Sequence, residues 1–156
     1  GTRRFHLLLR AFGSAASAWH AGDRELREAG LDARATASVL TVRARLDLDA
    51  ELRKIERAGA RMLTSLDDEY PPLLRHVDDA PIVLYIRGKL TPADERALAV
   101  VGTRRASTYG KDIAHQFSRQ LAEHGITIVS GMAHGIDAAA HMGALEAGGR
   151  TIAVIG

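Results

Sequence analysis

Two short segments in the second half of the sequence carry residues whose types and spacing could do chemistry. The first is VVGTRRASTYG, residues 100–110, in which a glycine ends an apolar run and two arginines follow directly. Backbone N–H groups at such a turn, and at the start of the next helix, favour an anion, and arginine can hold a phosphate through two parallel hydrogen bonds. The segment predicts a phosphate-binding loop made by Gly102, Thr103, Arg104, Arg105 and Ser107, with Ser107 also capping the following helix.

This first loop differs from the usual nucleotide-binding motifs. It lacks the second glycine of G-x-G-x-x-G and the Lys-Ser/Thr pair of a Walker A loop, so binding of an ordinary nucleotide cofactor is disfavoured and we expect no cofactor. The alternative is a plain strand-to-helix turn with solvated arginines.

The second segment is SGMAHGIDAAAHMGALEAGG, residues 130–149, which again places small residues between an apolar run and a helix. The carboxyl ends of neighbouring parallel strands share one edge of a sheet, so we expect the two loops to lie side by side. The anion-binding residues predicted here are Ser130, Gly131, His134 and Gly135.

Asp137 and His141 lie four residues apart and therefore share a helix face, where the carboxylate could orient the imidazole for catalysis or metal binding. The alternative is structural: Asp137 favours the helix N-terminus and His141 bonds locally. We predict the structural role, as for Tyr109 and Gly110 of the first segment. No other histidine shows ligand spacing and there is no cysteine, so we expect neither a metal nor a catalytic residue.

The elements that must position these loops follow from the hydrophobic pattern. Strands are predicted over residues 98–102, 126–131 and 151–156, with helices over 109–125 and 136–149. Uniformly apolar strands that alternate with helices predict a Rossmann-like parallel sheet, covered on both faces.

The first 60 residues have a different pattern, with helical periodicity broken by Gly13 and by Ser14, Asp23 and Asp32, each of which can start a helix. They predict a small all-helical domain over 1–60, followed by an α/β domain over 61–156 with a further strand near 82–88. Trp19, within the helices, is predicted to be a core residue rather than a base-stacking one.

Composition limits the function classes. With 46% hydrophobic and 26% charged residues among 156, the chain is typical of a globular protein, and it has no apolar run long enough to cross a bilayer and no signal-peptide pattern. We expect a cytoplasmic protein with no membrane partner. The absent initiating methionine and the apolar strand at the end indicate a fragment of a longer protein.

The two loop segments together resemble the core signature of the DprA/Smf family, through the strings GTRRASTYG and SGMAHGIDAAAHMGALEAGGRTIAVIG. The upstream strings DDEYPPLL and IVLYIRG resemble the family's connector and strand. The helices around LLRAFGS resemble its sterile-alpha-motif-like or helix-hairpin-helix-like module. The family often has proline where Thr108 stands, and threonine is acceptable at a first helical position.

This resemblance implies an extended Rossmann domain that binds single-stranded DNA through phosphate-gripping loops, without base specificity and without known catalysis. It implies loading of a RecA-type recombinase in natural transformation and homologous recombination, with a homodimer when full length. Gly102, Thr103 and Arg104 match the family's first loop, and Ser130, Gly131, Gly135, Asp137 and His141 its second motif.

Two other functions stay open at this stage. One is a nucleotide-hydrolysing enzyme of the lysine-decarboxylase-like superfamily, which shares the Rossmann core, although that group's P-G-G-x-G-T-x-x-E string is missing from this sequence. The other is an interaction module whose helical domain binds protein or DNA while the α/β part serves as scaffold.

Overall fold

The computed structural model describes residues 2–156, and the chain divides into two compact units, 1–89 and 90–156. The first unit begins with five helices and ends with a two-stranded antiparallel sheet, and the second holds a three-stranded parallel sheet with two long helices. The predicted α/β class, with helices first and a partial Rossmann-like sheet second, is confirmed. The predicted domain boundary after residue 60 stays a prediction, since the compact units divide after Lys89.

Three helices of the first unit begin at or next to the residues predicted to start them: Ser14 and Asp32 are N-caps, and Asp23 is the first residue of its helix, behind Gly22. The side chains of Ser14, Asp32 and Asp47 each accept a hydrogen bond from the backbone N–H three residues later. Gly13 takes the left-handed conformation, with φ of +75°, that ends the first helix. The helices are α1 (Thr2–Phe12), α2 (Ala15–His20), α3 (Asp23–Glu28), α4 (Ala33–Arg45) and α5 (Leu48–Arg57).

The core of these helices is small. Leu26 and Leu31 are buried together with two alanines, and the leucines of α1 pack against them. Trp19, predicted to be a core residue, is only half-buried, and its carbonyl accepts a hydrogen bond from Arg43. After α5 the chain forms the pair β1 (Arg61–Thr64) and β2 (Val83–Ile86), joined by a connector that contains the 3-10 helix η1 (Pro72–His76).

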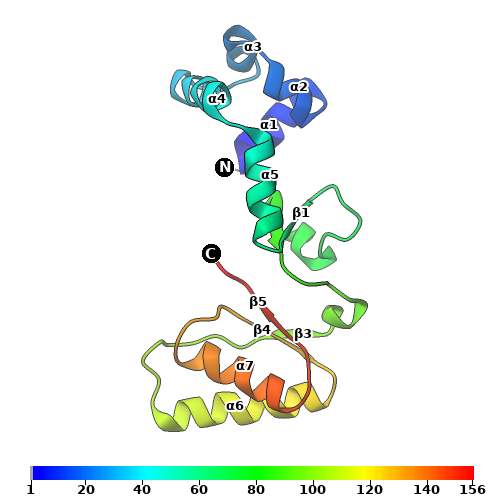
Figure 1. Cartoon of the computed structure of the whole chain (residues 1–156), viewed down its shortest axis with the longest axis vertical. Helices are drawn as coiled ribbons and strands as arrows, with labels where there is room; N and C mark the ends of the chain where they lie inside the picture. Colours follow the sequence, from blue (N-terminus) through cyan, green and yellow to red (C-terminus); the bar gives the residue numbers. More distant parts are fainter. Residues whose placement is uncertain (1) are drawn as a thin grey trace. The chain divides into compact units, whose positions relative to one another are not determined.

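The second unit is a β-α-β-α-β arrangement in strand order β3-β4-β5 (Figure 1). Its strands are shorter than predicted, although Val100 N–H still bonds the carbonyl of Val129 and Val154 N–H that of Ser130. After the 3-10 helix η2 (Pro92–Glu95), its elements are β3 (Ala97–Ala99), α6 (Thr108–Glu123), β4 (Thr127–Ser130), α7 (Ile136–Glu146) and β5 (Thr151–Ala153).

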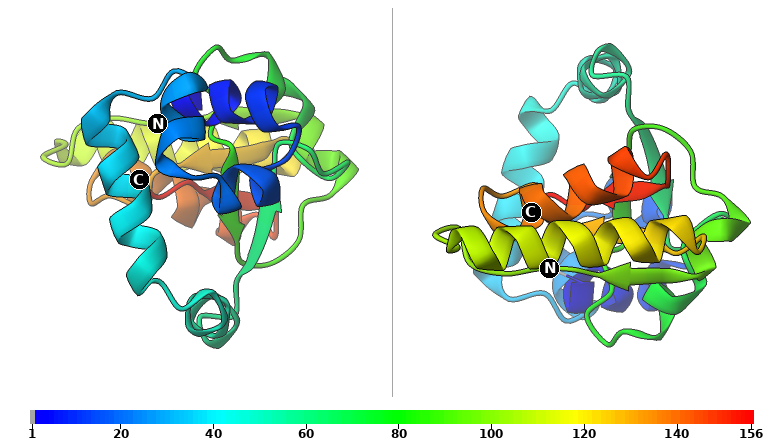
Figure 2. Two further views of the ribbon diagram at one scale, coloured as in Figure 1. Left: turned by 90° about the horizontal axis from the view of Figure 1, so that it is seen from above. Right: turned by 90° about the horizontal axis from the view of Figure 1, so that it is seen from below.

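Both long helices lie on the same face of this sheet, side by side, as Figures 1 and 2 show. Two right-handed crossovers that add strands in one direction place both helices on one side. The expectation that helices cover both faces is therefore wrong for residues 90–156. Helix α7 approaches α6 closely at Gly143, where a Cβ atom would lie 2.1 Å from the carbonyl oxygen of His115.

Asp94 joins the amino ends of the strands in the second unit. Its carboxylate accepts hydrogen bonds from Thr127 at the start of β4 and from Arg150 just before β5, at 3.2 and 2.5 Å. Arg150 holds the pKa of Asp94 below its usual value, mainly through this hydrogen bond. Over residues 2–156 the structure has no helix long and apolar enough to cross a membrane.

Candidate functional site

The two predicted loops meet at the carboxyl edge of the parallel sheet. Ile136 N–H, at the start of α7, donates to the carbonyl of Thr103 across the two loops at 3.3 Å. Where the two strands end and the loops begin, the Ser130 hydroxyl donates to the Val100 carbonyl at 2.6 Å. Thr103 and Ile136 lie more than thirty residues apart in sequence, so these bonds make the two loops one unit of structure.

Two glycines allow this close approach. Gly135 has φ of +91°, and a Cβ atom there would lie 2.3 Å from the Thr103 carbonyl oxygen and 2.8 Å from that of Arg104. A Cβ atom on Gly102 would lie 2.6 Å from the Ile136 side chain. Neither position has room for any side chain, because the opposing atoms are main chain in one case and a packed isoleucine in the other.

Asp137 links the same two loops through its carboxylate. The side chain is buried; Oδ1 accepts from Gly102 N–H at 3.2 Å and Oδ2 from Ala133 N–H at 3.4 Å. Charge-assisted bonds of this kind are among the stronger ones in proteins, and they use the first-turn position where a carboxylate is favoured. The N–H of Gly102 is therefore already bonded within the fold and is not free to meet an incoming anion.

His141 takes its orientation from a partner other than the one the helical spacing suggested. Its Nδ1 lies 2.7 Å from Oγ1 of Thr151, whose hydroxyl lies 2.8 Å from the carbonyl of Ile128 and donates to it. Because that hydroxyl has one hydrogen, Nδ1 must carry the proton and donate it to Thr151. The Asp137–His141 contact that the helical spacing allowed is not formed, because the carboxylate bonds loop amides and Thr151 orients the imidazole.

The arginines of the first loop face solvent. Arg104 and Arg105 are exposed and form no ion pair with any acid in residues 2–156. The two differ in how their main chains are held: the carbonyl of Arg104 lies against Gly135, whereas Arg105 N–H donates to Oγ1 of Thr103 at 3.2 Å. Arg104 therefore projects from a main chain that is fixed by the second loop.

The remaining predicted residues surround this point. Ser107 caps α6 as expected, accepting from Gly110 N–H at 3.1 Å, and Thr108 takes the first helical position. Tyr109 is 75% exposed, and His134 is exposed in the second loop. In the part of the chain that the structure describes, no group of three or more His, Cys, Asp or Glu side chains could hold a metal ion.

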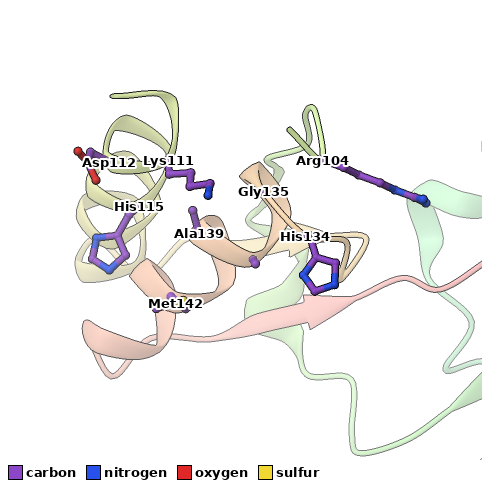
Figure 3. Close-up of a pocket in the computed structure, with 9 residues that line it drawn as sticks. Arg104, Lys111, Asp112, His115, His134, Gly135, Ala139 and Met142 are labelled. Carbon is purple, nitrogen blue, oxygen red and sulfur yellow. The ribbon is translucent and has the colours of Figure 1, made fainter. Parts of the chain in front are cut away.

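A groove of about 410 Å³ continues from the loops along α6 and α7 (Figure 3). Its polar lining includes side chains that sequence reasoning had not singled out, among them Lys111 and His115 of α6. The missed signal was helical spacing: Lys111 and His115 are four residues apart, and Gly135, Ala139 and Met142 recur at spacings that share a face of α7. The lining residues are Arg104, Lys111, Asp112, His115, His134, Gly135, Ala138, Ala139 and Met142.

Comparison with known proteins agrees with the resemblance seen in the loop segments. The family model for DNA recombination-mediator protein A matches residues 61–156. Protein Smf of Escherichia coli is 36% identical over 131 residues, which are 84% of this chain and 35% of that protein. DNA processing protein DprA of Streptococcus pneumoniae is 47% identical over 91 residues, which are 58% of this chain and 32% of that protein.

The similarity extends to the three-dimensional structure. The X-ray structure of DNA processing protein A from Streptococcus pneumoniae superposes with a TM-score of 0.75 and 32% sequence identity, over 99% of this chain and 53% of that chain. The present chain thus spans about half of that solved chain and about a third of the two curated relatives. The matches over the loops and over the whole fold lead to one conclusion: the chain belongs to the DNA recombination-mediator protein A family, whose relatives here are named DprA and Smf.

Proposed function

We propose that this chain is the part of a DNA recombination mediator that binds single-stranded DNA through backbone phosphates. The observation that carries the proposal is the joining of the two loops, which holds Arg104 on a fixed main chain while its guanidinium stays exposed and unpaired within residues 2–156. A planar guanidinium in that setting suits a phosphate, because two parallel N–H groups match two phosphate oxygens.

Recognition of the DNA backbone rather than of bases follows from the same residues. The loops offer arginines and main-chain groups, and the half-buried Trp19 belongs to the other unit of the chain. Contacts with phosphate carry no sequence information, so little preference among base sequences is expected. We further propose that the full-length protein delivers the strand to a RecA-type recombinase in recombination and natural transformation; the family name supports the part in recombination.

The test is the salt dependence of binding by the full-length protein to an oligonucleotide of mixed sequence. Each phosphate neutralised should contribute a log-log slope of about −0.7. A flat salt response would contradict the proposal, as would a strong preference for one base sequence.

The second test compares two adjacent arginines. Arg104→Ala should weaken binding by about 1.5 to 3 kcal/mol, the range for a charge-assisted hydrogen bond, and Arg105→Ala should weaken it less because Arg105 is not held against the second loop. A larger loss for Arg105→Ala would show that the loop has been assigned incorrectly.

A nucleotide-hydrolysing enzyme is the competing function, and the bonds of Asp137 and His141 argue against it. Both carboxylate oxygens of Asp137 and the Nδ1 of His141 bond groups of the fold. The other ring nitrogen of His141, Nε2, is buried and has no hydrogen-bond partner in residues 2–156, so neither side chain presents a free acid or base atom to solvent. Release of free base from nucleoside monophosphates, measured with melting temperature for Asp137→Asn and His141→Ala, separates the two. Turnover that either substitution abolishes without changing the melting temperature would favour the enzyme.

A further inference from the structure

The groove between α6 and α7 has a composition that the two loops do not explain. Its base is formed by Ala138, Ala139 and the side chain of Met142, which is 63% exposed. Lys111 borders it and forms no ion pair with any acid in residues 2–156. Its volume of about 410 Å³ lies in the range of sites that accept small ligands.

Charge divides the groove into two ends. At the end farther from the loops, the Nε2 of His115 lies 2.8 Å from the carboxylate of Glu146, which also lies 3.6 Å from the guanidinium of Arg119, so basic side chains there have an acid beside them. Toward the loops the lining residues are Arg104, Lys111 and His134, whereas Asp112, the one acid among the lining residues, lies beside His115 (Figure 3). The unpaired positive charge is therefore concentrated where the groove joins the loops.

The side chains of Lys111 and Arg104 point in different directions. In Figure 3, Lys111 extends from α6 toward α7 near Ala139, whereas the side chain of Arg104 extends away from both helices. Because these two side chains point apart, one phosphate does not bridge both cations in this arrangement. Two phosphates of one strand, on either side of the joined loops, fit the two directions.

The geometry points to a second nucleotide subsite in this groove, in which Lys111 and His134 bind the backbone phosphate that follows the one at Arg104. The apolar base accepts the attached sugar or base, because small alanines leave room and the flexible thioether of Met142 adapts to a flat apolar surface. This inference rests on the proposed function, since it gives the path of the strand once Arg104 has bound it. A strand that follows this path leaves the sheet edge along the α6–α7 groove.

Two charge-removing variants of the full-length protein test the subsite with a long single-stranded oligonucleotide. Lys111→Gln should weaken binding about fivefold and make the log-log salt slope shallower by about 0.7, the loss of one phosphate contact. Lys54→Gln is the matched control, because it removes the same charge from α5, where Lys54 pairs with Glu51. Equal affinities for the two variants would overturn the subsite.

A thiol probe tests the apolar base independently of charge. The chain contains no cysteine, so Met142→Cys and Leu145→Cys each add one thiol to it, at two positions of α7 that are both 63% exposed. With thiols elsewhere in the full-length protein replaced, saturating oligonucleotide should slow maleimide modification at position 142 at least about fivefold. It should leave position 145, outside the groove, within about twofold. Equal rates at position 142 with and without DNA would overturn the subsite.

Failure of the proposed function has a different signature. If wild-type protein does not bind single-stranded DNA, or if Arg104→Ala binds as well as wild type, the loops are not the DNA site and the proposed function fails. If wild type binds and Arg104→Ala is impaired while the Lys111 and Met142 variants show no effect, the subsite alone is wrong and the strand leaves the loops by another route.

Discussion

Each end of the parallel sheet is joined by one carboxylate. Both carboxylates accept hydrogen bonds from backbone N–H groups, Asp94 from that of Thr91, but in residues 2–156 only Asp94 also bonds side chains. At the amino end, Asp94 bonds the guanidinium of Arg150 and the hydroxyl of Thr127. At the carboxyl end, Asp137 bonds only backbone N–H groups, those of Gly102 and Ala133. At the amino end of the sheet, Arg150 is therefore paired with an acid of the fold. At the carboxyl end, Arg104 and Arg105 form no ion pair within residues 2–156.

Under the proposed function, this difference separates the groups that stabilise the fold from the side chains that would bind DNA. A carboxylate satisfied by main-chain donors can hold loops together without neutralising the side chains that would meet a phosphate. Packing at the carboxyl end then depends on glycines and on one buried acid, so the largest mutational effects on stability should lie there. The variants below test this separation in order of expected effect.

Gly135→Ala should have the largest effect. The new Cβ atom would meet the main chain of Thr103 and Arg104, and the backbone conformation at φ of +91° is one that side chains rarely adopt. We expect unfolding free energy to fall by at least about 3 kcal/mol, measured by urea denaturation. Gly148→Ala is the control, since it shares a positive φ of +65° but has no atom within 4 Å, and it should cost about 1 kcal/mol. Similar losses for the two would mean that the loops do not meet as described.

Asp137→Asn should follow, at about 2 kcal/mol, because the amide replaces one of two accepting oxygens with a donor facing a backbone N–H. The loss should be measured by thermal and urea denaturation. Asp94→Asn provides the comparison at the amino end and should cost about 1 kcal/mol, since Arg150 is 38% exposed and water can solvate it. A larger loss for Asp94→Asn would reverse the ranking of the two ends.

The pH dependence of stability should distinguish the amino end. The pKa of Asp94 is lower in the folded state than in the unfolded chain, so its contribution is present above the unfolded pKa of about 4 and is lost as pH falls through the folded pKa. Asp94→Asn should therefore make unfolding free energy less sensitive to acid below about pH 4. An unchanged acid profile in this variant would show that the Arg150 pair does not contribute to stability.

Arg104→Ala should have the smallest effect on stability, within about 0.5 kcal/mol, because its side chain is exposed and unpaired in the described part of the chain. It should nonetheless have a large effect on DNA affinity. A melting temperature that falls together with DNA affinity would show that Arg104 stabilises the loop. It would contradict the idea that different residues provide stability and binding.

Local signals in the sequence were sufficient for the elements and their starts. Ser14, Asp32 and Ser107 cap helices as predicted, because a capping bond joins residues only three positions apart. The alternation of apolar strands with helices likewise predicts a parallel sheet, since each element's period is a local property. The positions of both loops after strands followed from the same pattern.

Tertiary structure decided which distant groups meet. Asp137 and His141 share a helix face by spacing, yet the carboxylate bonds Gly102 and the imidazole bonds Thr151. The direction of the crossovers decided how many faces of the sheet the helices cover. The meeting of Asp94 with Arg150 likewise required whole elements to pack. Residues thirty or more positions apart come together only when whole elements pack, and no local spacing encodes that distance or direction. The sequence by itself therefore determined the elements and the position of the loops, and packing decided which side chains hold the structure and which stay exposed.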